Sequence, residues 1–206
     1  MIRIKTVHSE DSLFGKSKWW GCPDLPDDLE YPEVPVNEDG ELYYDPLTFI
    51  CQIRCEDLEG YDTEGLLPKS GMLYFFAALD YFLGNIEHAV SPQMGEWSPS
   101  LFRVLYTKEC DNLHGHSVLY DDGTPAYPSA EKIVFGSGNE ETRLLGEPYF
   151  DEVREEMGGM ISLLQIDEND SWNLRFFDSG MLNFLIYPKD LAKLRFDRVK
   201  CYLHSF

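Results

Sequence analysis

The hexapeptide Ser70-Gly71-Met72-Leu73-Tyr74-Phe75 returns later in the chain as Ser179-Gly180-Met181-Leu182-Asn183-Phe184, with five of the six positions identical. Agreement of this quality is expected by chance in roughly one chain in a hundred of this length. In each copy a Ser-Gly pair stands before an apolar run, which is typical of a turn that leads into a β-strand. The pattern predicts the same strand in two copies of one fold.

Three further pairs of matching segments flank the hexapeptides in the same order. These are residues 49–53 with 162–166, Gly21-Cys22-Pro23 with Gly146-Glu147-Pro148, and Arg103-Val104 with Arg198-Val199. The spacing between matched residues shrinks along the chain, as expected when loops shorten after a duplication. We therefore predict a single domain, residues 1–206, built from repeats at about 14–110 and 140–206. The repeats should pack as one unit, because each alone is too small to bury its apolar face well.

Short strands are the main elements that the residue pattern predicts. Branched and aromatic residues between turn residues indicate strands at 49–53, 72–77, 102–106, 133–135, 161–166, 181–186 and 199–203, and alternation indicates a first strand at 1–7. Two short helices are expected, at 149–157 before Gly158-Gly159 and at 188–194 with Pro188 in the first turn. The predicted class is α+β, rich in mostly antiparallel strands, with few helices and an internal duplication.

The composition restricts the class of partner. The 206 residues include 37 acidic and 17 basic side chains, for a formal net charge of -20, and 43% are hydrophobic, which is enough for a packed core. Such a negative field repels phosphate backbones and anionic lipids, so we expect no nucleic-acid and no membrane partner, and basic proteins are favoured. No apolar run is long enough for a membrane helix and no export signal is recognisable, so we expect a cytoplasmic protein. Five irregularly spaced cysteines predict free thiols, mostly buried.

The acidic charge is concentrated near the N-terminus. Residues 19–53 contain no Lys or Arg, whereas nine carboxylates and several prolines lie between Asp24 and Pro46. Prolines at this density exclude a long helix. The segment is either a solvated acidic arm or a surface that binds a basic protein. In the second case the candidate contact residues are Asp27, Asp28, Glu30 and Glu33.

Two glutamines interrupt the apolar strands at matched positions, Gln52 and Gln165. A buried amide needs partners for its donors and its acceptor. Those partners are either neighbouring backbone groups or a ligand in a pocket at the seam between the repeats. For the second case we predict a ligand pocket lined by Trp19, Trp20, Gln52 and Gln165.

Motifs for catalysis or cofactor binding are incomplete. Phe14-Gly15-Lys16-Ser17 lacks the earlier glycine of a phosphate-binding loop. The group of Cys110, His114 and His116 lacks a fourth metal ligand. Residues 167–178 resemble a calcium loop but carry Trp172 where the sharp turn needs glycine, which favours an acidic hairpin loop. We expect no catalytic residue, no metal and no cofactor.

Several motifs occur together in a fixed order: SKWWGCPDLP at 17–26, PLTFICQI at 46–53, LPKSGMLYFF at 67–76, LGEP at 145–148, LLQID at 163–167, and the closing residues 190–202. In this combination the chain resembles the YwqG-like family of bacterial proteins, a domain of unknown function. The resemblance implies a cytosolic α+β protein, and the toxin systems near which relatives are found imply an immunity or protein-binding role. The family usually has a second glycine where this chain has Trp20, so a backbone conformation that only glycine reaches is in question there.

The residues support two hypotheses of function. An acidic protein-binding module, of an immunity type with a basic toxin as partner, explains the charge and needs no catalytic motif. The alternative is a small-molecule-binding protein or enzyme with a pocket at the seam between the repeats, which explains the paired glutamines.

Overall fold

The computed structural model describes residues 1–86, 90–120, 122–138 and 142–206. Within these residues an antiparallel sheet of eleven strands forms the body of the molecule. In spatial order its strands are β8 (Gly95–Glu96), β15 (Lys200–Ser205), β14 (Gly180–Ile186), β13 (Ile161–Asp167), β12 (Arg143–Leu144), β1 (Ile2–Val7), β11 (Glu131–Ser137), β2 (Lys18–Trp19), β6 (Thr48–Arg54), β7 (Met72–Ala77) and β9 (Phe102–Thr107). The predicted fold class is confirmed.

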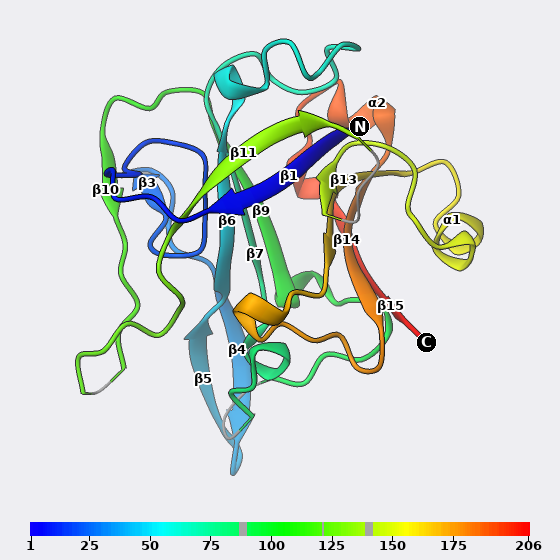
Figure 1. Ribbon diagram of the computed structural model, residues 1–206. Helices are drawn as coiled ribbons and strands as arrows, with labels where there is room; N and C mark the ends of the chain where they lie inside the picture. The colour runs from blue at the N-terminus through cyan, green and yellow to red at the C-terminus, as the bar shows by residue number, and fades with distance from the viewer. Residues whose placement is uncertain (87–89, 121, 139–141) are drawn as a thin grey trace.

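Two pairs of strands lie outside the large sheet. They are β3 (Asp24–Pro26) with β10 (Leu113–Gly115), and β4 (Glu33–Glu38) with β5 (Glu41–Pro46). The second pair is a hairpin that projects from the body of the molecule (Figure 1). The acidic segment, which lies within the described residues 1–86, therefore contains a regular hairpin and no long helix. A two-stranded hairpin tolerates Pro35 and Pro46 because each strand has an edge that needs no ladder hydrogen bond.

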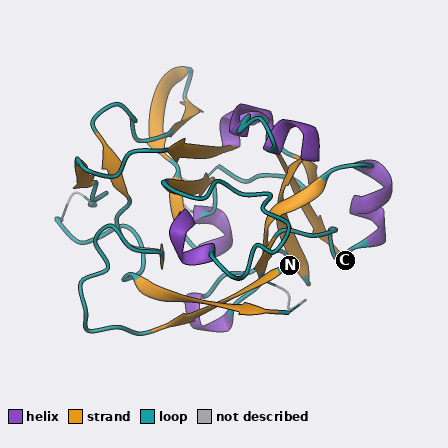
Figure 2. Cartoon of the chain, turned by 90° about the horizontal axis from the view of Figure 1, so that it is seen from above, coloured by secondary structure: helices purple, strands orange, loops and turns teal. Residues whose placement is uncertain are grey.

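Helices are few and short, and most of the chain is strand or loop (Figure 2). The α-helices are α1 (Asp151–Glu156) and α2 (Pro188–Leu191), both inside the predicted segments but shorter. Short 3-10 helices make up the rest: η1 (Cys55–Leu58), η2 (Asp80–Leu83), η3 (Pro99–Leu101), η4 (Asp170–Trp172) and η5 (Phe196–Arg198). Among the described residues, no helix has the length and apolar character needed to span a membrane.

The sheet is symmetric about the neighbouring strands β1 and β11. Outward from β1 lie β12, β13, β14 and β15, and outward from β11 lie β2, β6, β7 and β9, while the short edge strand β8 beyond β15 has no counterpart among the described strands. The first strand of each sequence half therefore pairs with the second strand of the other half, β1 with β12 and β11 with β2. The predicted duplication, with both repeats packed as one unit, is confirmed, and this exchange of first strands is a feature that the sequence matches did not include.

Strand register repeats as well. Gln52 lies opposite Lys18 and Tyr74 on its neighbouring strands, just as Gln165 lies opposite residues of β12 and β14. Each of these central strands has a bulge at the same place, two residues before its glutamine. The repeated glycines also share a cause: a Cβ on Gly71 would collide with the Thr107 carbonyl oxygen, and one on Gly180 would lie 2.7 Å from the corresponding oxygen of His204.

The main core lies between the two halves of the sheet. Phe75 and Phe184, which occupy matched positions in the repeats, meet there edge to face with ring centroids 5.4 Å apart. The opposite face of each half has its own cover and its own smaller core. Residues of β3, β4 and the loops around them cover β6 and β7, whereas α1 covers β14 and β15. The two repeats thus share a framework and differ in what covers it.

Candidate functional site

The segment that covers the first repeat begins at the Gly21-Cys22-Pro23 loop. Just before it, Trp20 has a φ of 58°, a left-handed conformation, and its counterpart Leu145 has a φ of 59°. The backbone N–H of Trp20 donates to the Ile50 carbonyl at 2.8 Å, which holds this conformation in place. The position at which the YwqG-like motif usually has glycine therefore does require a left-handed backbone. Trp20 adopts this conformation despite its Cβ because the indole is wholly buried in the main core.

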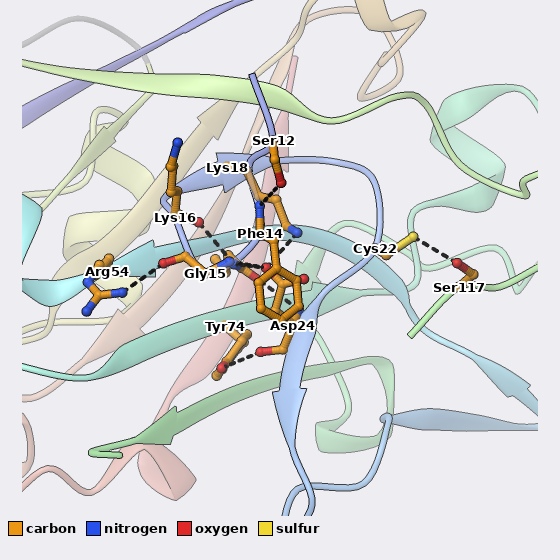
Figure 3. A network of polar contacts seen from close by, with 11 residues as sticks. Ser12, Phe14, Gly15, Lys16, Lys18, Cys22, Asp24, Arg54, Tyr74 and Ser117 are labelled. Atoms are coloured by element: carbon orange, nitrogen blue, oxygen red, sulfur yellow. Dashed lines mark hydrogen bonds and ion pairs between the residues drawn. The ribbon is translucent and has the colours of Figure 1, made fainter. Parts of the chain in front are cut away.

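Asp24, which follows this loop on β3, is the centre of a buried polar network (Figure 3). Its Oδ2 accepts hydrogen bonds from the Gly15 backbone N–H at 2.8 Å, from Lys18 Nζ at 2.8 Å and from Gln52 Nε2 at 2.7 Å. Its carbonyl oxygen accepts from the Tyr74 hydroxyl at 2.7 Å. The side chains of Lys18 and Asp24 are only 6% and 2% exposed, so this ion pair is a buried one. Asp24 therefore does not belong to the solvated acidic surface.

Backbone groups, together with the Asp24 carboxylate at Gln52 and the Arg143 guanidinium at Gln165, supply the partners of both predicted glutamines. Gln52 Oε1 accepts the Asp24 backbone N–H at 2.8 Å, and its Nε2 also donates to the Lys16 carbonyl at 2.9 Å. Gln165 Oε1 accepts the Tyr149 backbone N–H at 2.9 Å. Each amide thus anchors the residue that follows a Gly-x-Pro loop.

The two tryptophans of the predicted ligand pocket are wholly buried, as are both glutamines. Trp19 stacks on Trp172 with ring centroids 5.2 Å apart, and Trp20 meets the same ring edge-on at 5.6 Å. The indole N–H groups of Trp19 and Trp20 have no hydrogen-bond partner among the described residues. Neither of the two cavities described below is lined by these tryptophans or glutamines. A ligand at this seam stays a prediction.

An acidic cavity of about 390 Å³ opens between the end of β3 and the loop that joins β9 to β10. It is lined by Pro26, Asp27, Asp28, Thr107, Lys108, Glu109, Asp111 and Asn112. Four of these residues are carboxylates and one is basic. Two of the four are predicted contact residues, and Glu109 and Asp111 are brought to them from a loop more than seventy positions away in the sequence.

All four predicted contact residues are exposed to solvent. Asp27 and Asp28 line the acidic cavity, and His114 on β10 lies 3.2 Å from Asp27. Glu30 and Glu33 continue along the chain from this cavity to the start of β4. The four carboxylates therefore form a continuous stretch between the cavity and the hairpin.

The β4–β5 hairpin carries apolar surface beside its charge. Leu42 is 58% exposed and Tyr44 60% exposed, and Tyr43 between them is also exposed. Large exposed side chains on a projecting hairpin are of the type that protein interfaces use, since tyrosine supplies apolar area together with a polar tip. The hairpin and the acidic cavity are joined by a short stretch of chain, residues 27–32.

The other predicted features lie where packing explains them. The five cysteines are free, and Cys51, Cys55 and Cys201 are buried, which confirms that prediction. Burial raises the pKa of the Cys55 thiol to about 12 and the pKa values of Cys51 and Cys201 well above their usual range. The loop between β13 and β14 is an acidic hairpin loop, in which the Asn169 side chain accepts the Ser171 backbone N–H at 2.9 Å. In the described part of the chain, no three His, Cys, Asp or Glu side chains gather as metal ligands would.

Sequence reasoning missed the buried ion pair and half of the acidic cavity. Lys18 and Asp24 look like surface charges in the sequence, although Lys18 matches Arg143 in the repeat and Asp24 immediately follows the repeated loop. Those two matches were the available signal for a buried role. The sequence gives no signal for the role of Glu109 and Asp111, because their position beside Asp27 and Asp28 depends on the path of the loop after β9.

Comparison with known proteins gives a family but no characterised relative. A family model described as "Domain of unknown function (DUF1963)" matches residues 17–133 and 112–204. The matched segments together extend from the strand before the Gly21 loop to the last strand of the sheet. No curated protein matches the chain.

Proposed function

The chain belongs to the DUF1963 family of domains of unknown function, and from this premise we propose that it is a protein-binding module whose acidic surface takes basic side chains of a protein partner. The observation that carries the proposal is the acidic cavity, in which carboxylates of two separate loops converge on one space. Like charges repel, so their convergence costs stability in the unbound protein. A cationic partner group removes that cost, which makes this cavity a suitable receptor for a lysine or arginine side chain.

The balance of charge in the cavity supports a cationic occupant. Asp27, Asp28, Glu109 and Asp111 outnumber Lys108, the only basic residue of the lining. The volume of about 390 Å³ leaves room for the end of one long side chain. An arginine can bind two carboxylate oxygens at once through its planar guanidinium, so arginine is the preferred occupant.

The neighbouring hairpin supplies the apolar part of the proposed interface. Affinity in protein interfaces comes mainly from a few buried aromatic or arginine anchors, while surrounding charges steer the approach. Tyr43 and Tyr44 are exposed on β5, and the acids Glu30 and Glu33 lie between them and the cavity along the chain. We assign the steering to the acids and the anchoring to the tyrosines.

The comparison of the two repeats supports a role for this particular segment. In the second repeat the cover of the sheet is α1 with the residue after it, and their buried side chains Val153 and Met157 fill a small core. In the first repeat the cover fills a corresponding core through Leu25 and Val34, and it adds the acidic cavity and the projecting hairpin. Packing alone needs no such additions.

The finer part of the proposal concerns the class of partner. A toxin that acts on nucleic acid must itself be basic, and an acidic binding module would neutralise it. We assign the chain an immunity-type role in the cytoplasm on this ground, together with the YwqG-like motifs at 17–26 and 46–53. An adjacent toxin gene in the source genome would agree with this assignment.

Affinity capture from the native host with quantitative mass spectrometry tests the proposal. Wild type is compared with the cavity variant Asp27→Asn/Asp28→Asn/Glu109→Gln/Asp111→Asn. The control variant Glu10→Gln/Asp11→Asn/Glu155→Gln/Asp178→Asn removes the same charge from exposed positions elsewhere. We expect a basic protein that wild type and control capture and that the cavity variant loses at least tenfold. Capture that is equal for all three baits, or the absence of a basic protein, would contradict the proposal.

A further inference from the structure

A second cavity, of about 430 Å³, is lined in part by Gly21 and Cys22 of the Gly21-Cys22-Pro23 loop. One wall is the loop and the residues before it, and the other is formed by residues from 117–119 and 125–130. Cys22 and Ser117 join the two walls, with Sγ and Oγ 3.0 Å apart (Figure 3). Much of the lining is apolar and includes Leu13, Phe14, Val118, Leu119 and Tyr127.

The polar part of this lining is the buried pair of Lys18 and Asp24. All three hydrogen bonds to the Asp24 carboxylate go to Oδ2, and no described residue donates to Oδ1. Lys18 Nζ has three N–H groups, and Asp24 is its one acceptor among the described residues. Two residues of the cavity lining therefore have N–H donors and a carboxylate oxygen that no described residue uses.

Unused capacity of this kind is costly when the charged groups are withdrawn from bulk water. A buried ion pair repays its desolvation only when its remaining donors and acceptors are also satisfied. Water satisfies them in part, and a ligand with a matching donor and acceptor satisfies the carboxylate oxygen and one N–H group while its apolar portion covers the walls.

We propose that this cavity is a binding site for a small planar carboxamide or lactam with an apolar ring. The carbonyl oxygen of such a group accepts from Lys18 Nζ, and its N–H donates to Asp24 Oδ1. The ring then packs between Phe14 on one wall and Leu119 and Tyr127 on the other. This site is independent of the acidic cavity and goes beyond the proposed protein-binding function.

The same geometry disfavours charged ligands. A carboxylate would pair with Lys18 but would approach the negative charge of Asp24, and an amidinium would pair with Asp24 but approach Lys18. Within 4 Å of a poorly solvated charge, a repulsion of either kind is large enough to lower affinity at least tenfold. A neutral amide matches both partners without adding charge.

Three compounds of equal shape separate these cases: benzamide, benzoate and benzamidine. Binding is followed by two-dimensional amide NMR titration and by the rate at which Cys22 is alkylated. Cys110, which is also partly exposed but lies outside this lining, is the internal reference for alkylation. We expect benzamide to shift resonances of residues 13–24 and 117–130 in a saturable manner, to slow alkylation of Cys22 and not of Cys110, and to bind at least tenfold more tightly than benzoate or benzamidine.

Two variants place the binding in this cavity. Asp24→Asn removes the repulsion of anions, so the preference should reverse and benzoate should bind more tightly than benzamide. Leu119→Trp fills the cavity from a position that is 55% exposed and whose change the fold tolerates, so it should weaken benzamide binding at least tenfold even if Asp24→Asn does not fold. The acidic-cavity variant should bind benzamide like wild type.

The proposal is overturned if benzamide produces no saturable shifts at millimolar concentration, which would mean that water alone satisfies the pair. It is also overturned if the three compounds bind equally, or if Leu119→Trp binds benzamide like wild type. If no basic protein partner is captured but benzamide selectivity is observed, only the protein-binding function is contradicted. If a basic partner is captured but benzamide selectivity is absent, only this site is contradicted.

Discussion

Gln52 and Gln165 perform the same task in the two halves of the molecule. The side-chain carbonyl of each accepts the backbone N–H of the residue that follows a Gly-x-Pro loop, at 2.8 Å from Asp24 and at 2.9 Å from Tyr149. The loops share their glycine and proline, whereas the segments that follow them form different covers. The duplicated fold therefore kept the anchor of each cover while the covers diverged.

Removal of either glutamine should destabilise the protein. Gln52→Leu and Gln165→Leu each leave a backbone N–H without its acceptor, which costs about 1–3 kcal/mol of unfolding free energy. Gln93→Leu is the matched control, because Gln93 is exposed and should change stability by less than about 0.5 kcal/mol. Urea denaturation measures all three. If Gln52→Leu were as harmless as the control, the anchoring role would be wrong.

Trp20 should resist replacement by the glycine that its backbone conformation favours. Trp20→Gly relieves left-handed strain of about 1–2 kcal/mol but removes a wholly buried indole, and such a loss costs about 3–5 kcal/mol. The burial term is larger, so a net destabilisation of about 2 kcal/mol is expected in thermal or urea unfolding. A variant more stable than wild type would show that strain dominates at this position.

Thiol reactivity should separate the cysteines into two groups. At pH 8, Cys22 and Cys110 should react with a thiol reagent in the native protein, whereas the buried Cys51, Cys55 and Cys201 should react only after unfolding. Partial burial raises the pKa of Cys110, so this thiol should react more slowly than its exposure suggests and should speed up as the pH rises. Mass-spectrometric mapping of the labelled sites tests the assignment. Rapid native labelling of Cys51 or Cys201 would contradict the packing described above.

The long strands and their duplication could be predicted because their causes are local. The Ser-Gly turns at Gly71 and Gly180 recur where an adjacent backbone leaves no space for a Cβ, and the apolar runs after them fill both faces of a strand. The two-residue strands β2 and β12 could not be predicted, because a pair of residues has no periodicity. The exchange of β1 and β11 between the halves could not be predicted either, because it depends on pairing between strands that lie far apart in the sequence.

The candidate site was only partly predictable for the same reason. Exposed acids such as Asp27 and Asp28 follow directly from a segment without basic residues. The burial of Asp24, in contrast, depends on Lys18, Gln52 and Tyr74, which reach it from three different strands. Sequence alone cannot distinguish a carboxylate with such partners from its solvated neighbours.

The acidic stretch should act chiefly on the rate of association with a basic partner, because long-range charge steers encounter. The variant Asp27→Lys/Asp28→Lys/Glu30→Lys/Glu33→Lys tests this directly. The control Glu10→Lys/Asp11→Lys/Glu155→Lys/Asp178→Lys makes the same change in net charge at exposed positions elsewhere. Comparing the two variants separates the effect of this surface from that of total charge.

The decisive measurement is the association rate of the captured basic protein with wild type and both variants, by stopped flow over a range of salt concentrations. At low salt the Asp27–Glu33 variant should associate at least tenfold more slowly than the control variant, and the difference should shrink as the Debye length falls below about 8 Å. Equal rates for the two variants at low salt would contradict the account and would leave the acidic segment as a solvated surface.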